Sequence, residues 1–319
     1  MKTLRGLDAI PADCSASAVS IGKFDGVHVG HRAVIDDLRS IAGEHGLQSV
    51  VVTFDRHPLA LLAPAMCPES LVSTEQKLEL LADTGVNATL VLEFNEALAS
   101  LSPEDFIESI LVNALHVRQV LVGRDFRFGA KGAGDITLLQ RLGRTFGFDV
   151  RLIDDVTQDN SRRVSSSWIR ELILAGDTRT AAGLLGHLPT VRGVVVHGAK
   201  RGRDLGFPTA NLSPDSEGII PADGVYAGWL TDAGARYPAA ISVGNNPTFD
   251  GVAQKQVEAY VLDRDIDLYD HVVEVAFEER IRGMVAFTGI DPLIVQMRDD
   301  VDQVRRILAL PAGAAPSDG

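Results

Sequence analysis

The stretch Ser20–His31, SIGKFDGVHVGH, decides how the first half of the chain is interpreted. It follows an apolar run, Ala18–Ile21, and precedes a segment with helical periodicity, His31–Ala42. Three glycines interrupt this turn: Gly22, Gly26 and Gly30. Glycine lets the backbone approach a ligand closely, and a helix that follows a strand offers its N-terminal amides to anions. Open parallel sheets bind ligands at such strand ends. The stretch therefore predicts a phosphate-binding turn in an α/β domain.

The residues on either side extend this pattern to about Leu185. Apolar runs typical of strands alternate with segments that have helical periodicity. The expected strands are Ala18–Ile21, Ser49–Phe54, Ala88–Leu92, Val117–Val122 and Val150–Ile153. The expected helices are His31–Ala42, Thr74–Leu81, Pro103–Leu115 and Ile136–Arg144. Near-continuous apolar strands separated by helices predict a doubly wound parallel sheet with helices on both faces.

After Gly186 the pattern changes to short β-rich runs separated by glycine and proline turns. These runs are Thr190–Val196, Val225–Leu230, Ala239–Val243, Val257–Leu262 and Val272–Phe277. Their alternation predicts a small antiparallel β-barrel. A closing helix is expected at about Asp291–Leu310, where apolar residues recur at helical spacing. We therefore expect an α/β domain over residues 1–186 and a barrel domain over residues 187–319.

The composition is that of an ordinary globular protein. The chain has 319 residues, 45% of them hydrophobic, which is enough for two domains of about 150 residues each. Forty-three acidic and 30 basic residues leave a net charge of −13. This balance argues against a nucleic-acid partner, because a duplex binder needs a broad basic face. Phosphorylated small molecules stay compatible with it if positive charge is concentrated locally.

The cysteines and the hydropathy pattern indicate the cellular compartment. Cys14 and Cys67 are too far apart for a CxxC pair and too few for a disulfide framework, which suits a reducing environment. The N-terminal segment has no apolar core, and no apolar stretch approaches the roughly 18 residues of a membrane span. We expect a cytoplasmic protein without a membrane partner. The sequence leaves its oligomeric state open.

His28 and His31 are the candidate catalytic residues of the glycine-rich turn. Their spacing puts both rings on one side if the turn is helical. Two imidazole donors beside a helix N-terminus suit the binding of a triphosphate and the stabilisation of charge as its α-phosphate is attacked. A plain glycine turn with surface histidines is the alternative, which the preceding strand and following helix disfavour. A zinc site fits less well, because no nearby residues complete a tetrahedral set.

This stretch, GxFDGxHxGH, resembles the HxGH nucleotidyltransferase superfamily and within it the FAD synthetase branch. The resemblance implies that the turn binds ATP phosphates through Gly22, Phe24, Asp25, Gly26 and Gly30. A second segment, FDRHP at Phe54–Pro58, is similar to the family's FxPHP, from which Arg56 departs. The role of this loop is left open.

Two later segments extend the resemblance. VGRDFRFG at Val122–Gly129 is similar to the family's second substrate loop, which implies flavin contacts for Asp125, Phe126 and Phe128. SSSWIR is similar to the family's SSxxIR, which implies that Arg170 is catalytic and that it grips the ATP phosphates with three serines: Ser165, Ser166 and Ser167. From the residues alone, these serines fit a helix N-cap equally well.

A second glycine-rich block lies at Val195–Asn211, VVHGAKRGRDLGFPTAN. Flexible glycines with clustered cations suit an ATP phosphate tail, and a basic surface hairpin is the alternative. The phosphate-binding candidates are Gly198, Lys200, Arg203 and Gly206. On an extended segment Thr209 and Asn211 project to one face and offer the oxygen ligands that Mg²⁺ prefers. The tetrapeptide PTAN on its own is also compatible with a turn.

This block resembles riboflavin kinases, whose hallmark GxxxGRxLGFPTAN is complete here. Further motifs follow in order: GVY at Gly224, SVGNNPTF at Ser242–Phe249, VEAYVL at Val257–Leu262 and DLY at Asp267–Tyr269. Asp270 stands where the family usually has glycine after LY. The resemblance implies that Glu258 is the catalytic base and that Arg282 and Phe287 contact flavin. From the residues alone, Glu258 is also compatible with an outward-facing acid on a half-exposed strand.

The two resemblances together imply a bifunctional enzyme of flavin cofactor synthesis. The barrel domain would phosphorylate riboflavin to FMN, and the α/β domain would transfer AMP from ATP to FMN to give FAD. ATP is then the co-substrate of both steps, with Mg²⁺ as the metal. Two other hypotheses fit the residues less well. A different acceptor, phosphopantetheine or nicotinamide mononucleotide, would leave the kinase-like block unexplained. A flavin-binding module with decayed sites conflicts with the presence of all the candidate catalytic residues.

Overall fold

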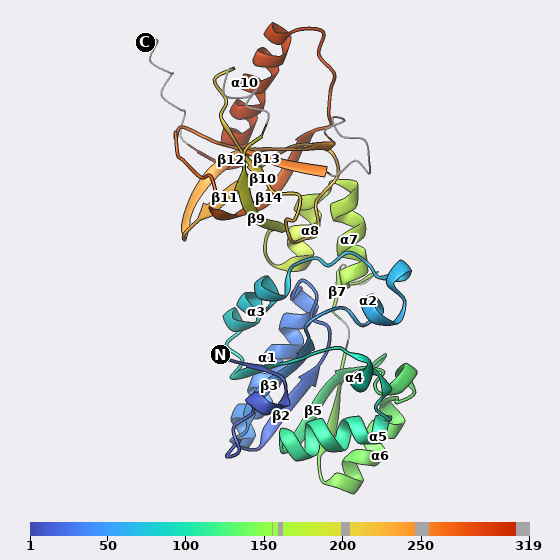
Figure 1. Cartoon of the computed structure of the whole chain (residues 1–319). Coiled ribbons are helices and arrows are strands. Elements are labelled where there is room, and N and C mark those ends of the chain that lie inside the picture. Colours follow the sequence, from blue (N-terminus) through green and yellow to red (C-terminus); the bar gives the residue numbers. More distant parts are fainter. Residues whose placement is uncertain (155, 159–161, 199–204, 246–254, 311–319) are drawn as a thin grey trace. The chain divides into compact units, whose positions relative to one another are not determined.

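The computed structural model describes residues 1–154, 156–158, 162–198, 205–245 and 255–310 (Figure 1). The chain divides into two compact units, Met1–Ser165 and Ser166–Gly319. The strands of the first unit are β1 (Lys2–Arg5), β2 (Ser17–Ile21), β3 (Gln48–Phe54), β4 (Ala88–Leu92), β5 (Val117–Gly123), β6 (Asp149–Ile153), β7 (Thr157–Gln158) and β8 (Arg162–Arg163). Its helices are η1 (Leu7–Ala9), α1 (Val29–His45), α2 (Pro58–Leu62), η2 (Pro64–Met66), α3 (Thr74–Asp83), α4 (Glu96–Ser100), α5 (Pro103–Phe106), η3 (Ile107–Ala114), η4 (Ala130–Gly132) and α6 (Ile136–Phe146).

Six strands of the first unit form one parallel sheet in the order β1-β4-β3-β2-β5-β6. The next strand in sequence, β3, pairs with one side of β2, whereas β5 pairs with the other side of β2. The strand order therefore reverses between β2 and β5, and open α/β sheets bind ligands outside the carboxyl ends of strands at this point. The predicted parallel sheet is confirmed. The edge strand β1 was not predicted, because its four residues are mostly exposed and show no apolar run.

Side chains of alternate strand residues enter two separate cores, one on each face of the sheet. Val19, Val50 and Val120 pack with η3 and α6 on one face. On the other face, the strand residues Ala18, Val51 and Leu121 pack with α1 and α3. The helix residues in this core are Ile35, Leu38 and Leu81. Burial on both faces requires the near-continuous apolar strands seen in the sequence. The prediction of helices on both faces is confirmed.

The second unit is a closed antiparallel barrel with flanking helices (Figure 1). Its elements are α7 (Ser166–Ala175), α8 (Thr178–Leu185), β9 (Thr190–Val196), β10 (Thr209–Leu212), β11 (Gly224–Asp232), β12 (Ala235–Asn245), β13 (Lys255–Val261), β14 (Val272–Arg282) and α10 (Ile290–Ile307). The strands close in the order β10-β13-β12-β11-β14-β9, and β9 pairs with β10. The predicted barrel and closing helix are confirmed.

Helix α10 covers part of the outer surface of this barrel. Along β13, Val257, Ala259 and Val261 are buried in the barrel interior, so the alternate residues Glu258 and Tyr260 face outward. Val304 of α10 packs on the outside with two residues of the barrel unit, Ala227 and Leu262. Side chains are thus buried in the barrel interior and also between the outer surface of the barrel and α10.

Two ion pairs hold α10 to the barrel. Arg282 at the end of β14 donates from Nε and Nη2 to the two carboxylate oxygens of Asp300, at 2.9 and 2.7 Å. Nearer the helix C-terminus, Arg305 Nη2 donates to Asp263 at 2.5 Å. The Asp300 carboxylate is almost fully buried, and a bidentate guanidinium partner satisfies both of its oxygens.

Helices α7 and α8 pack against the barrel and form part of the second unit. The hydroxyl of Thr178 donates to the carbonyl of Glu278 at 3.2 Å, and Arg179 pairs with Glu279 at 2.7 Å. The division by structure thus falls at Ser165–Ser166, whereas the sequence pattern changes near Gly186. These helices continue the α/β pattern in sequence, whereas the contacts of α8 are with the barrel strand β14.

Asp270 gives a direct test of backbone strain in the second unit. Its φ is +62°, in the left-handed region that glycine occupies freely and side chains disfavour. Asp270→Gly should therefore raise the free energy of unfolding by roughly 0.5–1 kcal/mol, and Asp270→Ala, which lacks a polar side chain suited to this region, should lower it. Both tryptophans, Trp168 and Trp229, lie in this unit, so their fluorescence during urea unfolding measures the effect.

Asp215 provides the matched control, since it is exposed and does not have a positive φ. Asp215→Gly should leave stability unchanged or lower it, because there glycine only adds freedom to the unfolded chain. A stabilising effect of similar size at both positions would rule out strain at Asp270 as the cause.

Candidate active sites

The glycine-rich turn after β2 brings the two predicted histidines together. His28 is the N-cap of α1, and its Nδ1 accepts a hydrogen bond from the backbone N–H of His31 at 3.3 Å. The two rings stack with centroids 3.7 Å apart and planes inclined by 15°. Because Nδ1 of His28 accepts, a neutral His28 ring must carry its proton on Nε2. The cap therefore fixes the tautomer and presents Nε2–H as a donor.

Both rings are held in the neutral form. Burial lowers the pKa of His28 to about 4, and the positive charge of Arg163 adds to the effect. The pKa of His31 is lowered well below its usual value by burial first, then by the charges of His28, Lys23 and Arg163. Within the described residues, the buried Nδ1 of His31 has no hydrogen-bond partner. At pH 7 the pair offers neutral N–H donors.

The glycines and Phe24 give the histidines room and support. The ring of Phe24 is buried, and its centroid lies 5.1 Å from that of His31. A Cβ at Gly22 would come within 3.1 Å of the Phe24 ring, and one at Gly30 within 3.1 Å of the His28 ring. Gly26 has φ +80°. A role of these residues in phosphate binding stays a prediction, and their observed contacts are with the histidine pair and the core beneath it.

One acidic and one basic side chain brace the loops around this turn. The carboxylate of Asp25 accepts the N–H of Leu71 at 2.9 Å, so it is used to hold the segment before α3. Lys77 of α3 is buried and donates to the carbonyl of Phe54 at 2.7 Å. Burial lowers the pKa of Lys77, and the nearby carboxylates of Asp25 and Asp55 partly oppose this. Sequence analysis missed Lys77, because nothing local distinguishes it from other helical lysines.

The loop after β5 lies at the switch point of the sheet and pairs with an arginine that sequence analysis missed. Arg163 of β8 donates from Nη1 to the Asp125 carboxylate at 2.8 Å, and this hydrogen bond lowers the pKa of Asp125. Phe126 and Phe128 stack at 5.5 Å. Phe128 is buried in the core, whereas Phe126 is half-buried. The only sequence indication of Arg163 is its place close to the SSSWIR motif, from which Val164 separates it.

The SSSWIR motif spans the end of one unit and the start of the other. Ser165 is the last residue of the first unit. Ser166, Ser167 and Arg170 lie in the first turns of α7, in the second unit. Their role in gripping ATP phosphates stays a prediction.

In the barrel, strand register brings Thr209, Asn211 and Glu258 together. Asn211 of β10 lies directly opposite Glu258 of β13, and Thr209 lies opposite Tyr260. The Thr209 hydroxyl hydrogen-bonds to the Glu258 carboxylate. Burial raises the pKa of Glu258, and the hydrogen bond from Thr209 partly opposes this. A half-buried carboxylate with a raised pKa is suited to accept a proton near neutral pH.

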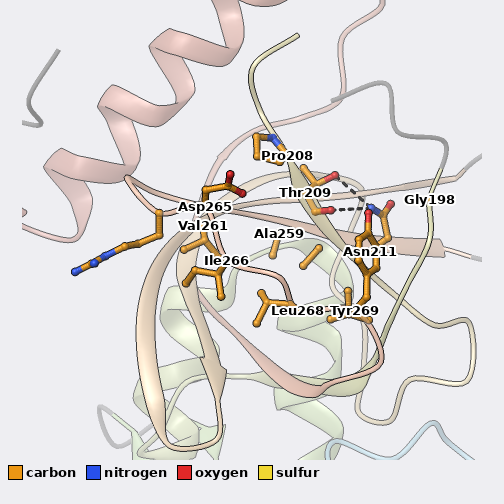
Figure 2. Close-up of a pocket in the computed structure, with 13 residues that line it drawn as sticks. Gly198, Pro208, Thr209, Asn211, Ala259, Val261, Asp265, Ile266, Leu268 and Tyr269 are labelled. Carbon is orange, nitrogen blue, oxygen red and sulfur yellow. Dashed lines mark hydrogen bonds between the residues drawn. The ribbon is translucent and has the colours of Figure 1, made fainter. Parts of the chain in front are cut away.

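The side chain of Asn211 is oriented by its neighbours (Figure 2). Its Nδ2 donates to the carbonyl of Thr209 at 3.1 Å and to the Thr209 hydroxyl oxygen at 3.3 Å. A Cβ at Gly198 would lie only 2.5 Å from Asn211 Oδ1, so only glycine leaves room for this amide. Gly206 has φ +85°. Lys200 and Arg203, the predicted cations of the phosphate loop, lie outside the described residues.

A pocket of about 50 Å³ opens beside Thr209 and Asn211 (Figure 2). Its other walls come from the barrel end and the segment after β13: Val195, Gly198, Pro208, Ala210, Ala259, Val261, Arg264, Asp265, Ile266, Leu268 and Tyr269. Pockets that hold whole cofactors measure about 300–1,000 Å³, so this space holds a small part of a ligand at most. Glu258 and Arg282 do not line it.

The remaining flavin-contact candidates lie at the end of β14. The guanidinium of Arg282 is engaged by Asp300 and also donates to the Gly283 carbonyl at 3.0 Å. Its Cζ lies 6.0 Å from the centroid of the Phe287 ring. The structure thus gives Arg282 an anchoring role toward α10, and its contact with flavin stays a prediction.

Comparison with known proteins identifies both units. A family model described as FAD synthetase matches residues 10–168, and one described as riboflavin kinase matches residues 185–308. A bifunctional riboflavin kinase/FMN adenylyltransferase from Listeria monocytogenes is 38% identical over 91% of this chain and 92% of that protein. The Escherichia coli K12 protein of the same description is 36% identical over 97% and 99%. The chain belongs to the bifunctional riboflavin kinase/FMN adenylyltransferase family. It phosphorylates riboflavin to FMN and adenylylates FMN to FAD.

A solved structure supports the fold of this bifunctional riboflavin kinase/FMN adenylyltransferase. The crystal structure of a macrolide-efflux protein from Streptococcus pneumoniae aligns with a TM-score of 0.84 at 30% identity, over 96% of this chain and 99% of that chain. Among the described residues, no helix has the length and apolar character needed to cross a membrane.

The neutral histidine pair predicts an unusual titration. The His28 ring should gain its proton near pH 4 instead of pH 6.5, which ¹⁵N NMR of labelled histidines measures directly. Because the unfolded chain takes up this proton at higher pH than the native chain, stability should be lost as pH falls from about 6.5 toward 4. In His28→Gln, which has no titrating ring there, this part of the acid sensitivity should disappear. Titration of the ring near pH 6.5 would contradict the buried, neutral state.

Proposed function

We propose that His28 and His31 stabilise the transition state of adenylyl transfer as neutral hydrogen-bond donors. A phosphate oxygen of FMN attacks the α-phosphorus of ATP, and the bond to the pyrophosphate oxygen breaks. The attacking group is already an anion, so the step needs no base. Nε2–H of His28 donates to an oxygen that gains charge in this step, and such a preorganised donor accelerates a reaction by about 10²–10³. The stacked, capped rings support this role.

Further cations and serines are proposed to bind the phosphates of this step. Arg163 holds Asp125 and lowers the pKa of both histidines, so its charge reaches the pair. We propose that Arg170 and the serines at 165–167 bind the ATP phosphates. Asp125, Phe126 and Phe128 are proposed as the flavin-binding residues of this step, and the half-buried Phe126 is the better exposed of the two rings.

For the kinase step, Glu258 is proposed as the general base. The ribityl hydroxyl of riboflavin attacks the γ-phosphorus of ATP and must lose its proton, while ADP leaves. The raised pKa of Glu258 improves its match to this proton. The observation that carries this proposal is the register that places Glu258 opposite Asn211 and in hydrogen-bond contact with Thr209. Arg282 and Phe287 are proposed to contact the flavin of this step.

Mg²⁺ is the metal that we propose for the kinase step, held by oxygens of Thr209 and Asn211. The close fit of Gly198 against the Asn211 amide orients that side chain. Among the described residues no cluster of three or more His, Cys, Asp or Glu side chains could hold a metal ion. Two neutral oxygens suit Mg²⁺, which is bound with few protein ligands plus phosphates and water. When bound, it neutralises developing charge on the phosphates.

The proposed setting of these reactions is the cytoplasm, with small-molecule substrates and without nucleic acid. The net charge of −13 supports the absence of a nucleic-acid partner, because an acidic chain repels polyanions. Such a chain must concentrate its positive charge at the sites that bind ATP.

Glu258→Gln tests the proposed base. The substitution keeps the shape of the side chain and removes the proton acceptor, so riboflavin phosphorylation should fall by about 10²–10⁴. Adenylylation of supplied FMN should continue at the normal rate. The two initial rates are measured by chromatography of the flavins.

The stability of the same variant provides a second readout. The raised pKa of Glu258 means that its charged carboxylate is less favourable in the native state than in the unfolded chain. At a pH above this pKa, the charged carboxylate therefore lowers the free energy of unfolding. Glu258→Gln should therefore unfold at a higher temperature than wild type at pH 7. Loss of both activities would indicate misfolding, and normal kinase activity would show that Glu258 is not the base.

We also propose that the adenylyltransferase portion of the chain ends, and the kinase portion begins, near residues 186–187. Two fragments test this boundary. The fragment 166–319 retains α7 and α8, whose contacts with the barrel it preserves, whereas 187–319 exposes the surface beneath them. Both should phosphorylate riboflavin and make no FAD, and the shorter should unfold at lower urea concentration. Equal stability would show that α7 and α8 do not support the barrel, and an inactive 166–319 fragment would contradict an independent kinase unit.

A further inference from the structure

The last part of β14 carries two bulges that change the direction of its side chains. The described pairing of β14 with β9 ends at Ala276, whereas its pairing with β11 continues to Arg282. Along this last part the register skips Glu278 and Ile281, which are extra residues relative to β11. Bulges redirect side chains and are common beside active sites. Here Ile281 packs with the residues beneath α10, and Arg282 next to it pairs with Asp300 of that helix.

The segment before β11 is held to the rest of the second unit through its backbone. The Tyr226 hydroxyl donates to the carbonyl of Ala222 at 2.5 Å, and Lys255 Nζ donates to the carbonyl of Pro221 at 3.0 Å. The N–H of Ala222 donates to the carbonyl of Ile173 in α7 at 3.3 Å. Burial raises the pKa of Tyr226 to about 12, so its hydroxyl keeps the proton that it donates.

Arg280, which lies between the two bulges of β14, makes a further bond to this segment. Its Nη2 donates to the carbonyl of Asp223, the residue before β11. Two glycines leave room for the side chain: a Cβ at Gly176 would lie 2.9 Å from Arg280 Cδ, and one at Gly224 would lie 2.7 Å from Arg280 Nε. A Cβ at Gly224 would also lie 2.5 Å from the carbonyl oxygen of Arg282. Arg280 therefore joins the start of β11 to the bulged end of β14.

The hydrogen bonding of Arg280 is incomplete, which argues against a role in stability alone. Its Nε is buried and has no hydrogen-bond partner among the described residues, and the same holds for Oδ1 of Asp223. A buried polar group without a partner lowers stability. A well-packed apolar side chain of similar volume is often at least as stable in such a place. The carbonyl that Arg280 holds is thus the better explanation for a guanidinium here.

We propose that Arg280 is a positioning residue for riboflavin phosphorylation, which holds the bulged end of β14 so that residues 283–289 leave the barrel in the orientation that binds flavin. These residues follow Arg282 directly and include Phe287. The proposal rests on the proposed flavin contacts of Arg282 and Phe287. It adds a cause for their placement, because Arg280 fixes the backbone from which this segment starts.

The test compares two variants of Arg280 in the full chain. Arg280→Met removes the charge and the donors, whereas Arg280→Lys keeps a donor for the carbonyl of Asp223. Arg179→Met is the matched control, because the exposed Arg179 pairs with Glu279, the neighbour of Arg280 on β14, and exposed ion pairs contribute little. The measured quantities are KM for riboflavin, KM for ATP, the rate of FMN conversion to FAD, and hydrogen–deuterium exchange of residues 283–289.

Arg280→Met should raise KM for riboflavin by roughly 10- to 100-fold, the loss expected for one hydrogen bond from a charged donor. Exchange of residues 283–289 should become faster, and FMN conversion to FAD should continue at the normal rate. KM for ATP should stay unchanged, because the proposed metal ligands Thr209 and Asn211 lie on β10, which pairs with β9 and β13. Arg280→Lys should return KM for riboflavin most of the way to wild type, and Arg179→Met should match wild type.

Two results with Arg280→Met would overturn the proposal. One is exchange of residues 283–289 at the wild-type rate, and the other is an equal rise in both KM values, which indicates general loosening of the barrel. If Arg280→Met does not fold, Tyr226→Phe removes another bond to the same segment and keeps the aromatic ring in the core. KM for riboflavin should then rise by about 2- to 10-fold, as expected for a neutral hydrogen bond, and a wild-type value would overturn the proposal.

Phe287→Ala separates this proposal from the function on which it rests. A wild-type KM for riboflavin in that variant would refute the flavin contact of Phe287, whatever the Arg280 variants show. Faster exchange of residues 283–289 in Arg280→Met with an unchanged KM for riboflavin would place the failure in the proposed flavin contacts and not in the hold of Arg280 on this segment.

Discussion

The hydrogen bond from the backbone of His31 to Nδ1 of His28 is the contact on which the adenylyl-transfer site depends. It caps α1, and it places the His31 ring directly against the His28 ring. It also determines which nitrogen of His28 carries the proton. Burial keeps both rings neutral, so one short-range bond defines the start of a helix, the geometry of the pair and its chemical state. His57 makes the same kind of contact, because its Nδ1 caps α2.

The kinase site depends instead on strand register in the barrel. Asn211, Thr209 and Glu258 come from strands that are distant in sequence, and the antiparallel pairing of β10 with β13 brings them together. The outer face that carries Glu258 also carries α10, which Arg282 and Asp300 hold in place. A one-residue slip of β13 would turn Glu258 into the interior and expose Val257 or Ala259. The apolar interior therefore protects the register on which the site depends.

The two sites meet different chemical demands. Adenylyl transfer begins from a phosphate anion and needs donors and cations, for which we propose the neutral histidines of the first unit, with Lys23 and Arg163 nearby. Phosphorylation begins from an alcohol and needs a proton acceptor, for which we propose Glu258 of the second unit, a carboxylate with a raised pKa. Burial is the main cause of the pKa shift in both cases. It keeps a histidine uncharged in one unit and makes a carboxylate more basic in the other.

The sequence by itself determined the class of both units and the order of their motifs, and it supplied the candidate residues for the chemistry. Apolar runs and helical periodicity are local properties, so β2 to β6, the barrel strands β9 and β11–β14, and α10 could be predicted, although β12 begins at Ala235 and β14 extends to Arg282, beyond the expected Ala239 and Phe277. The histidine pair and the PTAN segment were likewise recognisable, because each lies within one short stretch.

The tertiary structure alone decided what depends on contacts between distant residues. The edge strand β1 forms because β4 offers it a partner, and α7 and α8 join the barrel unit because it buries their apolar faces. Arg163 and Lys77 have no local pattern that marks them. The anchoring of α10 by Arg282 through Asp300 was likewise not visible in the sequence. These roles arise from through-space charge and burial, which spacing along the chain does not encode.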